Sequence, residues 1–520
     1  MITEPQTKTT ASRPSLLRST GVVSVLTLAS RVLGLCRDVV LAQFFGAGVA
    51  SDAFFVAFKI PNFLRRLFAE GAFSQAFVPV LAEYRERANP EDVRELIANT
   101  SGLLCVLLGF LTVLCVLGSP LLVWVFAPGF SQEPEKMALA AGLLRLTFPY
   151  IFFIALVALS ASVLNAYGHF ATPAAAPIVL NLVLISCAIV APDFAEPIRT
   201  LGWGVLIAGI LQWAMQLPSL RRRKVLVWPR LNWRHEGVRR IGALMVPALF
   251  GVSVSQINLL LDTVLASFLA SGSVSWLYYA DRLMELPLGV FGIAIATVIL
   301  PRLSQEHAGQ DPDAYARTLS WGLRLVLMVG VPASMALCVL AVPILATLFQ
   351  YRAFSAADTL QSMLALRAYS IGIVAFMLIK VLAPGFFARQ DTKTPVKIAV
   401  MGLALATSLA ALLNASMLYR ALRQAGIYRC EPGDGRFAWC VVLATILMSS
   451  VLVWVTPSDT FWFTTSLWLR VATLSGLMLL GLSAYLATLY ALGVRPHVLT
   501  PTTAVKMHGE CAHESSGDPL

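Results

Sequence analysis

The sequence predicts an all-α polytopic membrane protein with two parallel lobes and a central cavity between them. Composition is the first reason, because 58% of the 520 residues are hydrophobic and only 13% are charged, whereas roughly a quarter of the residues in a soluble protein carry charge. The second reason is a series of apolar runs of about 20 residues, the length that crosses a bilayer. The third is an internal repeat that brings charged side chains into these runs.

Apolar runs predict thirteen membrane spans. Seven runs contain no charged residue: Ser101–Ala127, Ala171–Ala191, Leu201–Leu220, Leu325–Phe349, Ile398–Tyr419, Phe437–Pro457 and Val471–Val494. Six more are long enough but contain ionisable residues: Gly21–Phe45, Ala53–Tyr84, Met137–Ala166, Ile241–Ala270, Ser273–Leu300 and Leu364–Phe387. No cleavage site follows a short apolar core near the N-terminus, so we expect no removable signal peptide.

Lysine and arginine collect in alternate loops, and this pattern predicts a cytoplasmic N-terminus, because short cytoplasmic loops carry the excess of positive charge. Basic loops follow the second, sixth, eighth and tenth spans, and the one with the most basic residues covers residues 221–240. The alternation breaks after Ile398–Tyr419, the eleventh span. If the N-terminus is cytoplasmic, the loop after this span should lie outside the cytoplasm, yet it begins with Arg420 and Arg423. Either the last two helices are inverted against their charge bias, or the chain lacks half of a helical hairpin.

The spans and loops divide the chain into six predicted segments. They are a cytoplasmic tail (1–20), an N-terminal lobe (21–220), a basic cytoplasmic loop (221–240), a C-terminal lobe that is one span short (241–422), a helix pair (437–494) and a polar tail (495–520). The eight cysteines show no paired spacing, so we expect neither a disulfide framework nor a metal site.

Two segments of the chain resemble one another. Residues 48–79 and 272–301 share a turn-forming start, an aromatic pair, a charge cluster and a closing proline. Each copy opens the second helix of a six-span block, which predicts two parallel lobes related by an axis along the membrane normal, with a cavity between them. The alternative is chance similarity between two amphipathic membrane helices.

Ionisable side chains cluster inside three expected spans. They are Arg31, Arg37 and Asp38 in the first span, Lys59, Arg65, Arg66 and Glu70 in the second, with Asp52 at its mouth, and Asp281, Arg282 and Glu285 in the eighth. A cation at mid-bilayer costs roughly 2.5–3.5 kcal/mol on insertion scales, so such residues usually line an aqueous cavity or pair with an acid. The first two spans hold two more positive than negative charges. Because guanidinium groups match phosphate oxygens, this excess predicts a phosphate-bearing substrate.

The spacing of these charges leaves a structural alternative open. Arg66 and Glu70 stand at i,i+4 and can pair, whereas Arg65 has no local carboxylate at that spacing. Asp281 and Glu285 share one helix face, with Arg282 beside them. In the alternative, the charged residues only pair with one another or extend to the lipid headgroups.

Other ionisable residues give weaker signals. Lys380 and Arg367 either line the second lobe or extend to the headgroups. We interpret Arg145 and Arg470 as interfacial anchors. The basic loop at 221–240 indicates topology and contact with anionic lipid headgroups, not nucleic-acid binding.

Long motifs carry a resemblance to a known family. They are Ser30–Asp38, Phe45–Gly48, Asp52–Phe58, Pro61–Asn62, Leu64–Pro79, Gly251–Ile257, Ala266–Trp276, Tyr278–Glu285 and Lys380–Phe386. In these segments the chain closely resembles the bacterial MurJ/MviN family of lipid II flippases, over most of residues 20–420. The resemblance implies the fold of the multidrug/oligosaccharidyl-lipid/polysaccharide exporters, in which two six-helix-type lobes form a V around a central cationic cavity. Two C-terminal helices would then form a lipid-facing groove for the undecaprenyl tail. The family has fourteen spans, and this chain has one fewer between Lys397 and Arg420.

The resemblance also implies a function. It implies a flippase, not an enzyme, that moves undecaprenyl-pyrophosphate-linked disaccharide-pentapeptide from the cytoplasmic to the periplasmic leaflet of the bacterial inner membrane by alternating access. The residues that match the family's substrate-handling arginines are Arg31, Arg37, Arg65 and Arg282. The expected gate or charge-pair residues are Asp52, Arg66, Glu70, Asp281 and Glu285, and Lys380 is a candidate for the second-lobe cavity. We expect no cofactor or metal, coupling to membrane potential or a monovalent cation, and lipid II, membrane lipids and the cell-wall synthesis machinery as partners.

Two other classes of protein fit the sequence less well. An exporter of another lipid-linked oligosaccharide or of a drug would share the architecture, but a cavity for cationic drugs would be rich in acids rather than arginines. A membrane enzyme of the same pathway would need positioned acids or nucleophiles, commonly in sizeable outside loops. The outside loops expected here are short.

Overall fold

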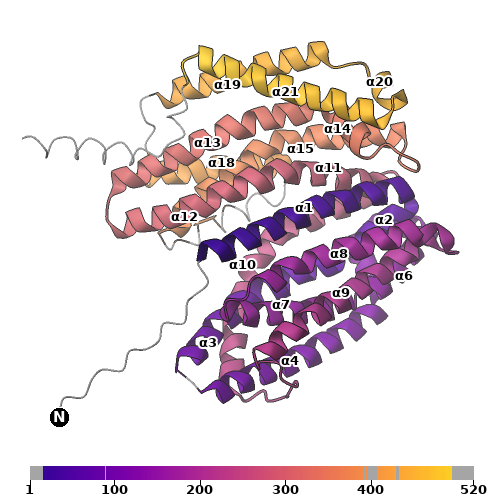
Figure 1. The fold of residues 1–520 in the computed structure, drawn as a ribbon, viewed down its shortest axis with the longest axis vertical. Coiled ribbons are helices and arrows are strands. Elements are labelled where there is room, and N and C mark those ends of the chain that lie inside the picture. Colours follow the sequence, from indigo (N-terminus) through magenta and orange to yellow (C-terminus); the bar gives the residue numbers. More distant parts are fainter. Residues whose placement is uncertain are drawn as a thin grey trace, which may run out of the picture. The chain divides into compact units, whose positions relative to one another are not determined.

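The computed structural model describes residues 16–87, 89–389, 391, 394, 395, 398, 407–428 and 433–494, and the regular structure in these ranges is helical, without strands (Figure 1). By contacts the chain divides into unit 1 (Met1–Phe45 and Val49–Gln256) and unit 2 (Gly46–Gly48 and Ile257–Leu520). Within the described ranges, eight helices are long and apolar enough to cross a membrane. The count of thirteen spans and the six predicted segments therefore stay predictions.

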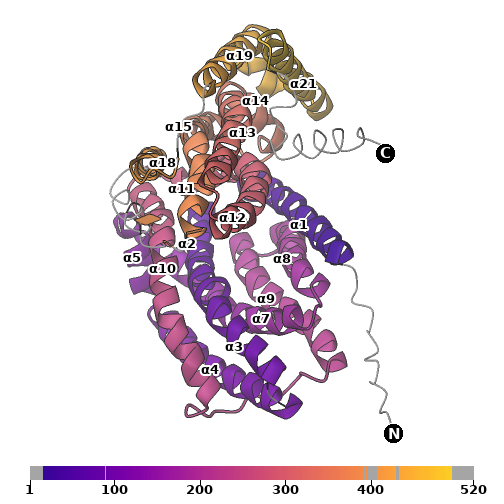
Figure 2. The ribbon, with the colours of Figure 1, turned by 90° about the vertical axis from the view of Figure 1, so that its left-hand side faces the viewer.

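Unit 1 is a bundle of long helices. Its elements are α1 (Leu16–Phe45), α2 (Val49–Leu64), the π-helix η1 (Arg65–Phe73), α3 (Ser74–Arg87), α4 (Pro90–Leu117), α5 (Ser119–Phe126), η2 (Pro128–Gln132), α6 (Pro134–Thr147), α7 (Tyr150–Ala166), α8 (Ala171–Val190), η3 (Ala191–Asp193), α9 (Pro197–Arg222) and most of α10 (Glu236–Ser267). Helix α8 packs between α1 and α9, and α7 packs against α9 (Figure 2). Phe77, Leu96 and Leu164 lie in the core that joins α3, α4 and α7.

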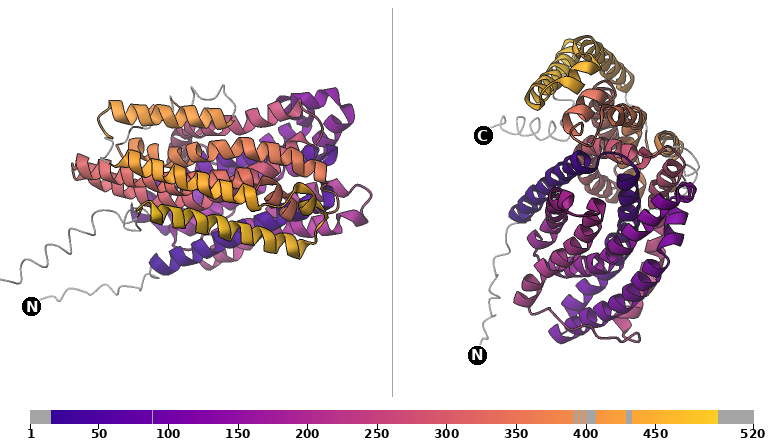
Figure 3. Two further views of the ribbon diagram at one scale, coloured as in Figure 1. Left: turned by 90° about the horizontal axis from the view of Figure 1, so that it is seen from above. Right: turned by 90° about the vertical axis from the view of Figure 1, so that its right-hand side faces the viewer.

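Unit 2 follows the same plan. It contains the end of α10, then α11 (Ser273–Pro287), the π-helix η4 (Leu288–Gly292), α12 (Ile293–Ala308), α13 (Pro312–Val339), α14 (Ala341–Leu348), α15 (Ala356–Leu382), α16 (Pro384–Phe387), α18 (Thr407–Gln424), α19 (Asp434–Val455), α20 (Asp459–Thr464) and α21 (Leu467–Ala491). Leu319, Ile373 and Leu422 share a core between α13, α15 and α18. Helices α19 and α21 lie side by side as a pair (Figure 3).

The repeat predicted from residues 48–79 and 272–301 extends through the backbone of both units. In each unit a helix is followed by a π-helical segment, a second helix, a long helix and a short one (α2, η1, α3, α4, α5; α11, η4, α12, α13, α14). Both long helices begin with proline after a polar residue, Asn89 before α4 and Asp311 before α13, because proline at the first helical position sacrifices only a donor that would be unused. Chance similarity between two helices would not produce this shared order.

Prolines inside the helices leave carbonyl groups that other helices satisfy. Pro61 has no N–H for the carbonyl of Ala57, and Thr147 Oγ1 of α6 donates to that oxygen at 2.9 Å. In unit 2 Pro332 frees the carbonyl of Met328 in the same way, and the Tyr485 hydroxyl of α21 donates to it at 2.7 Å. An unpaired carbonyl is costly away from water, so these bonds fix which helices pack together.

The direction of α18 bears on the break in charge alternation. Ser408 Oγ donates to Ala368 O, midway along α15, at 2.9 Å. Near its other end Leu422 lies in one core cluster with Phe386 of α16. Helix α18 therefore runs in the same direction as α15, so the basic residues at its C-terminal end lie at the Arg389 end of unit 2. The last two helices, α19 and α21, therefore need not be inverted against their charge bias. Residues 399–406 of the span predicted at 398–419 lie outside the described residues.

Candidate functional site

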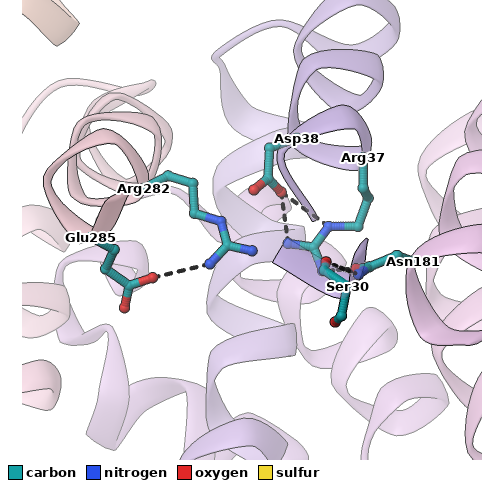
Figure 4. Close-up of polar contacts among 6 residues, drawn as sticks. All are labelled: Ser30, Arg37, Asp38, Asn181, Arg282 and Glu285. Atoms are coloured by element: carbon teal, nitrogen blue, oxygen red, sulfur yellow. Dashed lines mark hydrogen bonds and ion pairs between the residues drawn. The ribbon is translucent and has the colours of Figure 1, made fainter. Parts of the chain in front are cut away.

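Arg37 lies in a buried cluster between α1 and α8 (Figure 4). Its Nε and Nη2 donate to Asp38 Oδ1 at 3.0 and 2.7 Å, and its Nη1 donates to Asn181 Oδ1 at 3.1 Å. Asn181 Nδ2 donates in turn to Ser30 O at 3.0 Å. Arg37 is 6% exposed and Asp38 is fully buried. Because a buried charge requires a partner, this cluster fixes α1 on α8 and directs the Arg37 guanidinium at protein groups.

Arg31 lies on the same helix in a different environment. It is exposed, and within the described part of the chain its side chain makes no hydrogen bond or ion pair. A guanidinium on an apolar helix that is not engaged by the protein is available to the oxygens of an anion. Of the four predicted substrate-binding arginines, Arg31 has the most accessible charge in unit 1.

The second charged segment surrounds the start of η1. Arg65 is its first residue, is half-buried, and donates from Nε to Asn62 Oδ1 at 3.2 Å. Arg66 is exposed and Lys59 is half-buried. The side chain of Glu70 lies outside the described residues, so the Arg66–Glu70 pair stays a prediction. A π-helical segment inside an α-helix is often associated with a functional site.

Asp52, the predicted gate residue, forms a buried ion pair that sequence reasoning missed. Lys136 Nζ of α6 lies 3.1 Å from Asp52 Oδ2, with side chains 2% and 1% exposed. The ammonium also lies 4.5 Å from the centroid of the Phe130 ring and 3.9 Å from Glu133 Oε1. The available signal was a lysine in the first turn after Pro134, at the start of a long apolar run. This pair joins the first turn of α2 to the first turn of α6.

In unit 2 the predicted charges form a looser group on α11. Arg282 Nη1 lies 3.0 Å from Glu285 Oε2, with side chains 32% and 41% exposed (Figure 4). Asp281 is half-buried, and Lys380 of α15 is exposed. Partly exposed pairs of this kind contribute about 0–1 kcal/mol. An anion can therefore compete with Glu285 for Arg282 at little energetic cost.

The interpretation of Arg470 as an interfacial anchor is wrong. Arg470 is buried at the start of α21 and donates to four backbone carbonyls, those of Thr465, Ala346, Gln350 and Phe463, at 2.8 to 3.3 Å. Carbonyls at helix ends lack partners within their own helix, and this guanidinium satisfies several at once. Arg145, by contrast, is exposed, and its Nε donates to Ser119 Oγ at 3.0 Å.

The charge balance of unit 1 favours an anionic ligand. The segment from Arg31 to Glu70 holds two more positive than negative charges, and α6 adds one more, because it carries Lys136 and Arg145 against Glu135. Asp38 and Asp52 are already held in buried ion pairs. In the described ranges no three histidine, cysteine or acidic side chains are placed to hold a metal ion. The repeated helical units fit a membrane transporter, and these cationic side chains favour an anionic substrate.

Comparison with known proteins gives the family. The family described as Lipid II flippase MurJ matches residues 41–402, and the chain belongs to it. The chain is 47% identical over 507 residues to a probable lipid II flippase MurJ of Vibrio cholerae, covering 92% of this chain and 97% of the relative. It is 42% identical to the lipid II flippase MurJ of Burkholderia cenocepacia over 464 residues, 85% of this chain and 90% of the relative.

A solved structure of the same family agrees with this assignment. A lipid II flippase MurJ in an inward closed conformation matches with a TM-score of 0.76 and 26% identity, covering 90% of this chain and 97% of that one. An inward-facing multidrug resistance MATE family transporter of the MOP superfamily matches with a TM-score of 0.57 and 13% identity, over 84% of this chain and 99% of that one. The second likeness shows the fold alone.

Proposed function

We propose that this chain moves lipid II across the bacterial inner membrane, from the cytoplasmic to the periplasmic leaflet, by alternating access and without bond chemistry. The main support for this proposal is that the chain matches the lipid II flippase family over most of its length. The accessible arginine charge on apolar helices supports a pyrophosphate-linked substrate. Drug export has no comparable support, since the multidrug transporter shares only the fold.

The four predicted arginines handle the pyrophosphate in different ways. Arg31 and Arg65 in unit 1 and Arg282 in unit 2 contact it directly, and the weak Arg282–Glu285 pair opens as the substrate binds. Arg37 binds substrate only when its guanidinium is shared with or released from Asp38. Charge pairs that involve Asp52, Arg66, Glu70, Asp281 and Glu285 contribute to switching, because substrate must favour one conformation to drive the change. Lys380 lines the cavity on the side of the second lobe.

The setting of the transport cycle completes the proposal. The N-terminus and the basic loops face the cytoplasm, consistent with the positive charge at one end of unit 2. No cofactor takes part, and membrane potential or a monovalent cation supplies the coupling. Membrane lipids surround the protein, and the cell-wall synthesis machinery consumes its product.

Replacing single arginines tests the assignment. Arg31→Ala and Arg282→Ala each remove a charged contact worth about 1.5–3 kcal/mol, so lipid II binding should weaken by roughly 10- to 100-fold. Translocation of a fluorescent lipid II into the opposite leaflet of reconstituted vesicles, and growth of a strain depleted of its own flippase, are the measurements. Normal translocation and growth with either variant, at normal membrane levels, would refute the assignment.

Arg199→Ala is the matched control. Arg199 is half exposed and pairs with Glu196 before α9, so the same change in charge and volume should leave transport unchanged. Arg37→Ala separates binding from stability, since it also leaves Asp38 buried without its ion-pair partner. This variant should lower thermal stability as well as transport, whereas Arg31→Ala should lower transport alone.

A further inference from the structure

Unit 1 contains an apolar groove formed by α4, α7, α9 and the segment that follows α9. Its volume is about 480 Å³, within the roughly 300–1,000 Å³ of sites that enclose a small molecule. The lining residues are Ile97, Ser101, Cys105, Phe152, Leu156, Leu159, Ser160, Val163, Trp213, Leu217, Leu220 and residues 225–229. The hydroxyl of Ser101 already donates to Ala98 O. An occupant must therefore present an apolar body.

The segment at 225–229 is a fixed wall of this groove. Arg230 N donates to Ala98 O of α4 at 2.9 Å, and Val225 N donates to Leu220 O at 3.1 Å. A Cβ at Gly102 would lie 2.0 Å from Arg230 O, so only glycine at this position permits the approach. These contacts tie both ends of the segment to helices that line the groove.

Positive charge flanks the same wall. Arg221, Arg222, Arg223, Lys224 and Arg230 are exposed, and within the described residues their side chains form no ion pair. Trp228 lies between them and is 89% exposed. Tryptophan is enriched where a protein surface meets the headgroup layer, and each basic residue near an anionic membrane surface contributes about 1 kcal/mol to attraction.

We propose that this groove binds one acyl chain of an anionic phospholipid, whose phosphate lies against the basic residues beside Trp228. The apolar groove accounts for the chain, and the flanking charges account for the headgroup. The polyprenyl tail of the transported lipid is far longer than one acyl chain and exceeds the volume available. None of the arginines assigned to transport lines the groove, so the site is separate from the proposed substrate contacts.

Photolabelling tests the proposal directly. The full chain in phosphatidylcholine nanodiscs is exposed to trace phosphatidylglycerol that carries a diazirine at the end of one acyl chain, and labelled peptides are mapped by mass spectrometry. Labels are expected in the groove-lining parts of α4, α7 and α9. Excess unlabelled phosphatidylglycerol should compete, and a matched phosphatidylcholine probe should label the groove at least tenfold less. Equal labelling by both probes, or labels confined to other elements, overturns the proposal.

Charge and volume variants separate the two parts of the site. Replacing Arg221, Arg222 and Arg223 together by glutamine should weaken phosphatidylglycerol labelling by about 100-fold, whereas Arg199→Gln, at the other end of α9, should leave it unchanged. Ser160→Trp should fill the groove and abolish labelling. If Ser160→Trp fails to fold, the exposed triple variant decides, and unchanged labelling in it refutes the headgroup assignment.

Competition with lipid II distinguishes this site from the transport function. Labelling should persist in Arg31→Ala, whatever that variant does to translocation, because Arg31 does not line the groove. Lipid II should not displace the phosphatidylglycerol probe from the groove. Displacement by lipid II at lower concentration than by phosphatidylglycerol would assign the groove to substrate and overturn the proposal.

Discussion

The same contact is made with different chemistry in the two units. In unit 1 the fourth residue of α2, Asp52, forms an ion pair with the third residue of α6, Lys136, at 3.1 Å. In unit 2 the fourth residue of α11, Trp276, donates from its indole Nε1 to the third residue of α15, Asp358, at 2.9 Å. The repeat thus preserves the position of a polar contact and changes the groups that make it.

The difference between these two contacts shows which part of the contact the fold requires and which part depends on charge. The contact attaches the first turn of α2 to α6 in unit 1 and the first turn of α11 to α15 in unit 2. Attachment of these two helices is therefore the requirement that both units share. Unit 1 uses two fully buried charges, neither of which is tolerated alone. In unit 2 Asp358 keeps further partners, because Ser355 N and Oγ donate to its other oxygen at 2.9 and 2.7 Å. The unit 1 contact should therefore be the more sensitive to substitution.

The largest effect is expected from Lys136→Met. Removing the ammonium leaves the Asp52 carboxylate buried without this partner, which should lower the free energy of unfolding by about 3–5 kcal/mol. Thermal unfolding of the purified protein in detergent measures the change. Asp52→Asn combined with Lys136→Met removes both charges and should recover part of the loss, so equal destabilisation in the single and double variants would contradict a paired role.

A smaller effect is expected from Trp276→Phe. The indole donor is lost while the ring volume is partly kept, and Asp358 retains its bonds to Ser355. A hydrogen bond to a charged group contributes about 1.5–3 kcal/mol, and the loss should lie near the lower value. The same thermal assay tests the order of the two effects: if Trp276→Phe destabilises more than Lys136→Met, the comparison between the units fails.

The smallest effects are expected where helices satisfy carbonyls freed by proline. Thr147→Val in unit 1 and Tyr485→Phe in unit 2 each remove one hydroxyl donor, to Ala57 O and Met328 O. Hydrogen bonds between membrane helices average about 0.6 kcal/mol and reach about 1.7. The two variants should therefore shift the unfolding midpoint slightly and to a similar degree. Thr147→Ser, which keeps the hydroxyl, is the control for the first.

Much of the fold could be predicted from hydropathy and repetition. Apolar runs identify long helices because backbone polar groups must bond within a helix away from water, and the repeat at 48–79 and 272–301 recurs in the backbone with its π-helical segments. Helix ends differ from the predicted spans, as in α4, which begins at Pro90 rather than Ser101. Hydropathy marks the apolar stretch, whereas the helix continues into polar residues to its cap.

The partners of the charged residues could not be predicted in the same way. Asn181 bonds Arg37 from 144 positions away, and an uncharged residue in an apolar helix gives no signal of that role. Lys136 resembled a loop residue, since it stands at the edge of a run. Arg470 binds carbonyls from two separate segments, 346–350 and 463–465, and only the packed structure shows that those oxygens need donors.

The parallel course of α15 and α18 has a consequence for how this chain tolerates loss of length. Phe387 and Gln424 therefore lie at the same end of unit 2, so any shortening between them that keeps α18 in place leaves everything downstream in the same compartment. Deleting one complete helix elsewhere would instead turn every later loop to the opposite compartment.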